Sequence, residues 1–238
     1  LTIGYGTHVV QSALTFSLNE GEMVCMLGPN GCGKSTLLRT LAGLLPPLGG
    51  TYRLLGVSSE KAGESSAERA KHLALVLTER LSLEHTTVHD VVAMGRYPYS
   101  SFLGGLSADD EAVIADALQQ VGLQDMADTY FNNHSDGEKQ RILIAKALAQ
   151  QTPVILLDEP TAHLDLPNRI RTLQLLRHLA HEQGKTILIS THELDLALQL
   201  SDRILLMSDG GIQLDTAQAL RSRNAFTDAF QMDIFHPL

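Results

Sequence analysis

Residues 22–35 read Glu-Met-Val-Cys-Met-Leu-Gly-Pro-Asn-Gly-Cys-Gly-Lys-Ser, and this stretch decides the fold. Its first six residues are a short, mainly apolar run that predicts a buried strand. A glycine-rich loop follows, and residues 34–45 carry apolar side chains at helical spacing. Strand, loop and helix in this order are the context that supports a phosphate-binding loop of the pattern G-x-x-x-x-G-K-S/T. The stretch therefore predicts an α/β fold with a phosphate site at a strand end.

Each residue type in this loop suits a polyphosphate. The glycines let successive backbone N–H groups turn inward around phosphate oxygens, and the helix N-terminus adds partial positive charge. Lys34 is expected to reach the β- and γ-phosphates, Ser35 to bind Mg²⁺, and Thr36 to contact the α-phosphate. The predicted nucleotide-binding residues of the loop are Gly28, Pro29, Asn30, Gly31, Cys32, Gly33, Lys34, Ser35 and Thr36.

A second apolar run, 154–157, ends in two carboxylates, Asp158 and Glu159. In a parallel sheet the carboxyl ends of the strands face the ligand crevice. We expect Asp158 to bind Mg²⁺ or one of its waters, and Glu159 to act as general base toward the attacking water. Taken alone, these residues are also compatible with a polar strand end before a turn at Pro160, although the catalytic interpretation is favoured. The phosphate loop upstream favours the catalytic interpretation.

The remaining chain predicts an α/β core with a helical insertion. Residues 186–190 and 204–207 are short apolar runs typical of buried parallel strands, and 166–183 is predicted to be an amphipathic crossover helix. Residues 57–71 predict a solvated loop running into a short helix, and 217–230 a last helix. The region before the second apolar run shows helical segments and no convincing strand, at 90–95, 108–121 and 138–150.

Composition and net charge limit the classes of function that the chain can have. The net charge of −9 disfavours a free-standing nucleic-acid binder, which is usually basic. Cys25 and Cys32 do not suggest a disulfide framework or a zinc site. No apolar run approaches the ~20 residues that span a membrane, and no basic-then-apolar signal opens the sequence. We therefore expect a cytoplasmic protein that would work at a membrane only by docking onto a spanning partner.

Further motifs resemble those of ATP-binding cassette (ABC) proteins. The run Ser135-Asp136-Gly137-Glu138-Lys139-Gln140-Arg141 is similar to the family's signature sequence, L-S-G-G-Q/E-x-Q-R. Ala162-His163-Leu164-Asp165 resembles the D-loop. His192 matches the switch histidine, and Tyr5 matches the aromatic residue that stacks on adenine. These motifs stand in the family's order and cover nearly the whole chain.

The resemblance implies a P-loop NTPase (RecA-like) core, with an N-terminal antiparallel β region and a helical subdomain inserted before the signature motif. It predicts a single ABC ATPase domain over 1–238. The core would comprise about 1–80 and 151–238, and the helical subdomain about 81–150.

The resemblance also implies a head-to-tail homodimer, in which each ATP lies between one chain's phosphate loop and the other chain's signature. Ser135, Gly137 and Glu138 would then bind the partner's nucleotide, and His192 would contact the γ-phosphate in its own chain. ATP would close the dimer, Glu159, Lys34 and His192 would carry out hydrolysis, and product release would reopen it.

Simpler interpretations exist for several of these residues. Ser135-x-x-Glu138 is also a capping box for the helix that follows, and both roles can hold together. A lone histidine at a strand end is usually a polar surface residue, and Tyr5 could serve only in core packing. The histidines that we interpret as ordinary are His134, His163, His178 and His181.

The sequence departs from the family pattern at two places. His134 and Asp136 replace the signature's leucine and first glycine. Because an extra carboxylate near a triphosphate is unfavourable, we expect Asp136 to point away or to be offset by Arg141 or Lys139. Thr78 stands where the family has the Q-loop glutamine. Its hydroxyl can bind Mg²⁺ or a metal-bound water but reaches less far.

The runs Thr87-Val88-x-Asp90-Val91-Val92-x-x-Gly95-Arg96-x-Pro98 and Leu164-Asp165-Leu166-Pro167 resemble the branch that powers import of iron chelates (iron-siderophore complexes), haem and cobalamin. This implies an ATPase at the cytoplasmic face of the inner membrane, two integral membrane permease subunits and an extracytoplasmic solute-binding protein, with no nucleic acid. The permease's coupling helix would meet a groove formed by Phe102, Leu103 and Leu106, unless these residues serve local packing.

A soluble ABC ATPase of DNA repair or translation is the alternative function. Such proteins generally carry two cassettes, long coiled-coil insertions or basic surfaces, and none is visible in this sequence. A nucleotide-binding subunit without catalytic activity is disfavoured by Lys34, Asp158, Glu159 and His192.

Cys32 is expected to have no role in the loop beyond its small size, but the reactivity of its thiol can report nucleotide binding. Lys34 and the helix N-terminus should favour its thiolate form, so a bulky maleimide should attack it and Mg-ATP should protect it. Cys25, on the preceding buried strand, should react slowly.

Overall fold

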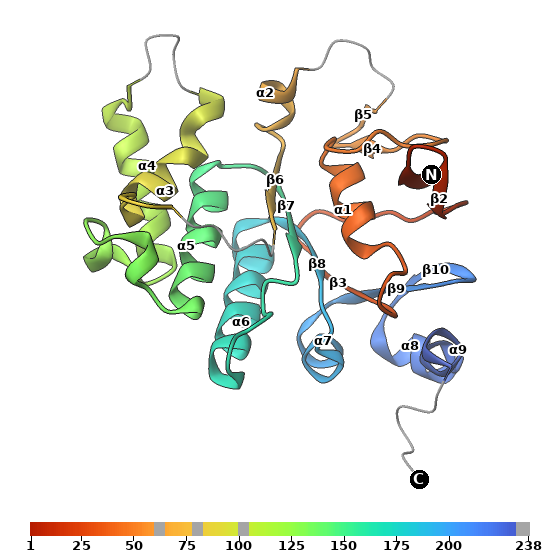
Figure 1. Ribbon diagram of the computed structural model, residues 1–238. Coiled ribbons are helices and arrows are strands. Elements are labelled where there is room, and N and C mark those ends of the chain that lie inside the picture. Colours follow the sequence, from red (N-terminus) through yellow and green to blue (C-terminus); the bar gives the residue numbers. More distant parts are fainter. Residues whose placement is uncertain (60–64, 78–82, 100–104, 232–238) are drawn as a thin grey trace.

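The computed structural model describes residues 1–59, 65–77, 83–99 and 105–231, which Figure 1 shows as ribbons. Its strands are, in chain order, β1 (Ile3–Tyr5), β2 (His8–Gln11), β3 (Met23–Leu27), β4 (Arg53–Leu54), β5 (Val57–Ser58), β6 (Leu73–Val76), β7 (Val154–Asp158), β8 (Thr186–Ser190), β9 (Arg203–Ser208) and β10 (Gly211–Asp215). Its α-helices are α1 (Lys34–Leu41), α2 (Ser66–Arg69), α3 (Val88–Ala93), α4 (Ala108–Gln120), α5 (Asp136–Ala149), α6 (Leu166–Gln183), α7 (Leu194–Leu200), α8 (Ala217–Ser222) and α9 (Ala225–Phe230). Short 3₁₀ helices occupy Met94–Tyr99, Gln124–Met126 and Phe131–Asn133. Within these ranges no helix is long and apolar enough to cross a membrane.

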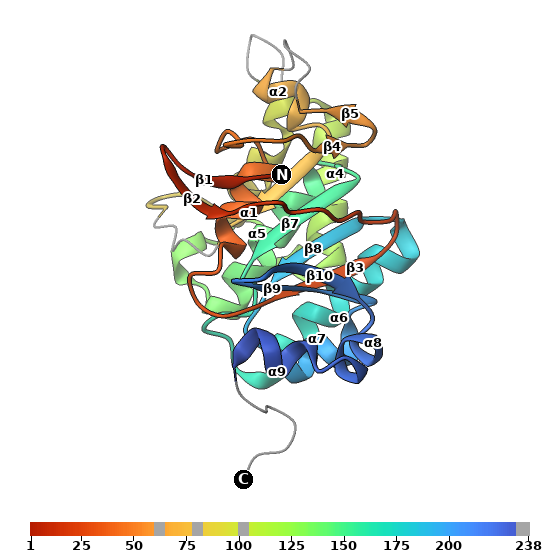
Figure 2. The same cartoon turned by 90° about the vertical axis from the view of Figure 1, so that its right-hand side faces the viewer.

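A mixed sheet forms the centre of the fold. Within the described residues its strand order is β10-β9-β3-β8-β7-β6, and every neighbouring pair is parallel except β10 with β9. Two separate antiparallel hairpins, β1–β2 and β4–β5, accompany it. Figure 2 shows β1, β2 and α1 on one side of the sheet and α6 to α9 on the other. The expected α/β fold with an N-terminal antiparallel region is confirmed.

Strand β3 shows how the sequence builds both faces of the sheet. All of its residues are buried, and successive side chains point to opposite faces. Val24 and Met26 belong to the apolar cluster that includes Leu37 and Leu38 of α1. The other residues of β3 belong to a larger cluster that includes side chains of α6, α7, α8 and α9. A strand covered on both faces reads as a continuous apolar run, as it does here.

The helical insertion is present as expected. Helices α3, α4 and α5 pack together beside the sheet (Figure 1). Arg96 is buried and connects these elements: its Nε donates to Asp110 Oδ1 of α4 at 2.7 Å, and its Nη1 donates to the Ala149 carbonyl of α5 at 2.7 Å. The division into core and subdomain near residues 80 and 150 stays a prediction.

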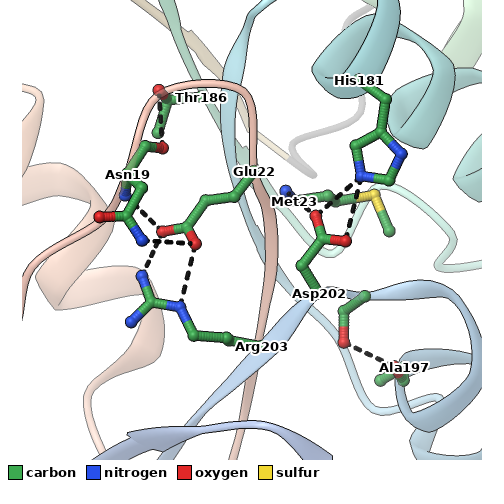
Figure 3. Close-up of polar contacts among 9 residues, drawn as sticks. Asn19, Glu22, Met23, His181, Thr186, Ala197, Asp202 and Arg203 are labelled. Carbon is green, nitrogen blue, oxygen red and sulfur yellow. Dashed lines mark hydrogen bonds and ion pairs between the residues drawn. The ribbon is translucent and has the colours of Figure 1, made fainter.

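Polar contacts fix the amino ends of β3 and β9 (Figure 3). Arg203 pairs with Glu22, and its Nε donates to Glu22 Oε2 at 2.9 Å. Next to this pair, Asp202 accepts the Met23 N–H at 2.8 Å and contacts His181 Nε2 at 3.0 Å. These contacts hold the ends of the strands that lie opposite the phosphate loop, because the loop leaves the carboxyl end of β3.

Two predicted helices are wrong in length. The helix predicted over 34–45 ends at Leu41, because Gly43 adopts a left-handed conformation with φ 77°. The N–H groups of Leu44 and Gly43 bond the carbonyls of Arg39 and Thr40, which closes a Schellman motif. The helix predicted over 217–230 is two helices, α8 and α9, separated where Asn224 has φ 55°.

Several elements were not predicted. Strand β10 returns antiparallel to β9 after the turn at residues 209–210, where the sequence indicated only the end of a strand. Strand β5 lies inside the segment predicted as solvated loop, and the short helix expected after it is α2. Strand β6 and helix α7 were also not recognised. Strands β5 and β6 contain only two and four residues, so their periodicity is weak in the sequence.

Candidate active site

The predicted catalytic groups meet at the carboxyl ends of three neighbouring strands. The phosphate loop follows β3, Asp158 and Glu159 stand at the end of β7, and His192 follows β8. Because the order is β3-β8-β7, these strand ends lie side by side. The fold therefore brings together residues that are separated by more than a hundred positions in the sequence.

The phosphate loop closes around its own lysine. Helix α1 begins at Lys34, directly after Gly33, whose φ of 105° is unfavourable for any residue with a side chain. Lys34 is only 7% exposed. Its Nζ donates to the carbonyls of Gly28 at 2.8 Å and Pro29 at 3.1 Å. A buried ammonium at a helix N-terminus, held only by neutral carbonyls in these two contacts, suits the negative oxygens of a phosphate chain.

Hydroxyl and carboxylate oxygens gather next to the loop. Ser35 Oγ donates to Asp158 Oδ1 at 3.0 Å, and Ser190 Oγ donates to the same oxygen at 2.6 Å. Hydroxyl and carboxylate oxygens are the ligand types that Mg²⁺ takes in triphosphate sites. Two of the three residues predicted to hold Mg²⁺ through oxygen, Ser35 and Asp158, thus lie in contact, and their chemistry fits the ion.

Glu159 is held in an unusual backbone conformation. Its φ is 47°, in the left-handed region that residues with side chains rarely adopt. Its N–H donates to both the carbonyl of Ser190 at 3.1 Å and the Ser190 hydroxyl at 2.9 Å. Its carboxylate contacts His192 Nε2 at 2.6 Å. Such conformations persist where the surroundings over-determine them, and they cluster at functional sites.

Ser190 is a site residue that the sequence did not reveal. It is fully buried, and its hydroxyl bonds both Asp158 and the Glu159 backbone. A serine at the end of an apolar strand carries no motif of its own, and its partners lie 31 and 32 positions away. Only the neighbouring position of β7 and β8 in the sheet indicates its place.

We expect Ser190→Ala to lower ATP turnover by about tenfold, since it removes two hydrogen bonds of about 1 kcal/mol each that orient the carboxylates. Affinity for ATP should change less, because neither bond touches the phosphate loop. Steady-state kinetics check this. Ser201→Ala is the matched control, since Ser201 Oγ donates to a helix carbonyl, that of Ala197, at 2.6 Å. Wild-type turnover in Ser190→Ala would contradict the expectation.

Tyr5 lies beside the phosphate loop helix and is not a core residue. It is 48% exposed, and its hydroxyl lies 3.4 Å from Thr36 Oγ1. The interpretation of Tyr5 as core packing is therefore wrong. An exposed ring next to the start of α1 is placed where a nucleotide base could stack on it.

The signature segment forms the capping box that the sequence predicts. Ser135 Oγ accepts the N–H of Glu138 at 3.4 Å, and Glu138 Oε2 accepts the N–H of Ser135 at 2.9 Å. The Ser135 hydroxyl and then its N–H lower the pKa of Glu138. Gly137 is buried against Asn168, whose side-chain nitrogen would lie 3.1 Å from an added Cβ. Ser135 itself is exposed.

The departures from the family pattern are accommodated locally. Asp136 is exposed, and its expected orientation away from the triphosphate stays a prediction. The residues expected to offset it make other contacts, since Arg141 donates to the Val121 carbonyl at 3.2 Å and Lys139 lies over the Phe131 ring. Two of the four histidines interpreted as ordinary have polar partners. His134 Nε2 contacts Thr129 Oγ1 at 2.7 Å, and His181 Nε2 contacts Asp202 Oδ1 at 3.0 Å.

Some predicted residues lie outside the described ranges. Thr78, the predicted metal contact, is one of them, and Phe102 and Leu103 of the predicted groove are two others. Leu106, the third groove residue, is 41% exposed.

The expectation that Cys32 favours the thiolate is wrong. Burial raises the pKa of its thiol, and this effect exceeds the lowering by the Lys34 charge and by backbone hydrogen bonds. The expected burial of Cys25 is confirmed, and burial raises the pKa of its thiol to about 12. Both thiols are therefore weak nucleophiles at neutral pH in the folded state.

The mainly parallel sheet, the closed glycine-rich loop before α1 and the oxygen cluster at the end of β7 define a P-loop nucleoside triphosphatase. Comparison with known proteins specifies the family. The chain matches the ABC transporter family over residues 12–162, and it belongs to that family. It is therefore an ATP-binding cassette ATPase.

Relatives support this assignment along most of the chain. The iron(3+)-hydroxamate import ATP-binding protein FhuC of Bacillus subtilis is 37% identical, over 98% of this chain and 86% of that protein. The ferric enterobactin transport ATP-binding protein FepC of Escherichia coli is 37% identical, over 89% of this chain and 78% of that protein. A dimeric post-hydrolysis structure of the cassette MJ0796 with ADP and Pi aligns with TM-score 0.76 at 27% identity, over 91% of this chain and 95% of that one.

Proposed function

We propose that this chain is the ATP-hydrolysing subunit of an importer for iron-siderophore complexes, haem or cobalamin. The observation that carries the hydrolytic part is the contact of Ser35 and Ser190 with Asp158 beside a buried Lys34. The named functions of FhuC and FepC support the importer and the iron-chelate class of solute. No such support exists for a soluble repair or translation factor among these relatives.

Each residue of the site has its own proposed role in ATP binding or hydrolysis. Lys34 and the loop N–H groups bind the phosphate chain, and Ser35 and Asp158 hold Mg²⁺, which neutralises phosphate charge when bound. Glu159 takes a proton from the attacking water. His192, now in contact with Glu159, contacts the γ-phosphate once ATP is bound. Tyr5 stacks on the adenine.

The site is completed by a second copy of the chain. Ser135 is exposed at the start of α5, where the capping box orders the first turn and the helix N-terminus carries partial positive charge. We propose that Ser135, Gly137 and Glu138 of one chain face the ATP held by the partner's phosphate loop. The MJ0796 cassette is dimeric with ADP and Pi bound, which supports a dimer of this chain.

The homodimer is proposed to act on membrane-embedded permease subunits at the cytoplasmic face of the inner membrane, with an extracytoplasmic binding protein delivering the solute. Leu106, exposed beside α4, belongs to the surface that would meet the permease. The net charge of −9 agrees with the absence of nucleic acid from the proposed partners.

The experiment is transport in proteoliposomes that contain this chain with its permease subunits and the matching solute-binding protein. We expect ATP-dependent accumulation of a ferric siderophore, haem or cobalamin, and no accumulation with Glu159→Gln. ATP hydrolysis without uptake of any of the three solutes, and without stimulation by the permease, would contradict the importer assignment while leaving the ATPase in place.

A further inference from the structure

Gln11 is a buried polar residue behind the phosphate loop. It ends β2 and is only 7% exposed. Its carboxamide Nε2 donates to the carbonyl of Cys32 at 3.1 Å and to the carbonyl of Ser208 at 2.9 Å. A carboxamide has two N–H groups, so both are used. One side chain thereby joins β2, the phosphate loop and the end of β9.

The same two strands also touch the ends of the loop. A Cβ added at Gly28 would lie 2.4 Å from the Met207 carbonyl of β9. A Cβ added at Gly33 would lie 2.9 Å from Val10 Cγ1 of β2. The loop thus packs between β2 and β9, and Gln11 of β2 bonds both the loop at Cys32 and the end of β9 at Ser208. The position of the loop therefore depends on its contacts with β2 and β9 as well as on its own glycines.

The contact with Cys32 also orients a loop N–H group. The Cys32 carbonyl and the Gly33 N–H belong to one peptide unit, and a trans peptide holds these two groups on opposite sides. A carbonyl that is bound to Gln11 therefore directs the Gly33 N–H away from β2, toward the side on which the loop receives phosphate. If the Cys32 carbonyl is released, the peptide can rotate and withdraw this donor.

We propose that Gln11 is a positioning residue for ATP binding, which keeps the loop's donors aimed at the phosphates before the nucleotide arrives. The proposal rests on the assignment of this loop as the nucleotide site. Preorganised donors bind more tightly than donors that must first be ordered. Loss of Gln11 should therefore weaken nucleotide binding more than it slows the chemical step.

The first test replaces Gln11 with methionine, which has similar length and no donor. We expect Gln11→Met to raise the dissociation constant of a fluorescent ATP analogue about tenfold, which corresponds to one or two lost hydrogen bonds. The turnover number at saturating ATP should change little. Gln213→Met, an exposed position on β10, is the matched control and should leave both quantities unchanged.

The alkylation rates of the two cysteines distinguish a change confined to the loop from a general loosening of the core. Cys32 lies in the loop, whereas Cys25 is fully buried in β3 and is exposed only when the core opens. We expect Gln11→Met to speed alkylation of Cys32 in nucleotide-free protein about tenfold and to leave Cys25 unchanged. Equal acceleration of both thiols, unchanged labelling of Cys32, or faster labelling with unchanged nucleotide affinity would each overturn the proposal.

A second variant tests the donor itself. Gln11→Glu keeps the shape of the side chain. Its ionised carboxylate cannot donate a hydrogen bond to either carbonyl, whereas its protonated form can donate one. Burial raises the pKa of such a carboxyl. The variant's affinity defect relative to wild type should therefore shrink as pH falls from about 8 to about 6. A pH-independent defect would overturn the donor role, and failure of the wild type to bind the analogue would instead refute the nucleotide site.

Discussion

Replacing Glu159 with glutamine is expected to lower the ATP turnover number by about a hundredfold or more. Glutamine keeps the shape of the side chain and its contact with His192, which spans 2.6 Å in the wild type. It has no basic oxygen that can take a proton from water. ATP binding should persist, because the phosphate contacts belong to Lys34 and its loop.

The same variant should accumulate as a dimer in Mg-ATP. Unhydrolysed ATP would remain between the phosphate loop of one chain and the exposed Ser135 of the other. Light scattering would detect the resulting dimer. Glu193→Gln is the control, because this neighbouring carboxylate pairs with Arg169 and should not alter turnover. A Glu159→Gln protein that turned over ATP within tenfold of wild type, or stayed monomeric with ATP bound, would contradict the site proposed here.

The sequence predicts those parts of the fold that follow from local patterns. The run from Met23 to Lys34 combines an apolar strand, glycines and a helix start, and each part restricts the conformation of the next. The Ser135–Glu138 capping box is similarly local, because both partners lie within one turn. These features need no information from distant residues, so they were predicted with their correct partners.

Helix ends depended on conformations that the sequence leaves open. Gly43 could continue or end the helix before it, and its left-handed conformation ends the helix at Leu41, so that the leucines at 44 and 45 lie outside it. Asn224 divides the last helical segment in the same way. Asparagine and glycine both adopt this conformation readily, and tertiary packing decides whether they do.

The site residues that were missed act through partners far along the chain. Ser190 bonds the residues at the end of the neighbouring strand, and Gln11 bonds a carbonyl 197 positions away. Neither residue type nor spacing indicates such pairs, because only the strand order brings them together. Cys32 shows a different limit: its neighbour Lys34 was recognised, but the burial that outweighs the lysine's charge depends on the packed structure.

Lys34→Met is expected to raise the dissociation constant for ATP about a hundredfold, which corresponds to the loss of one strong charge-assisted contact of about 3 kcal/mol. The variant keeps the length of the side chain and loses its charge. In the free protein the ammonium is buried against two neutral carbonyls, which offset only part of the cost of burying a charge. The folded protein without nucleotide should therefore be as stable as wild type, or more so.

This separation of stability from binding is measurable by thermal unfolding with and without ATP. At a ligand concentration of about 100 times the dissociation constant, ATP stabilises the wild type by about 2.7 kcal/mol, and the variant should lose most of this shift. Lys185→Met is the matched control, because Lys185 is half-buried and, like Lys34, donates to a backbone carbonyl, that of Thr152, at 2.8 Å. Its ATP-dependent shift should equal that of the wild type. If Lys34→Met kept the full shift, the ammonium would have no part in holding the phosphates. If it lost stability without nucleotide, Lys34 would serve the fold of the loop as well as the ligand.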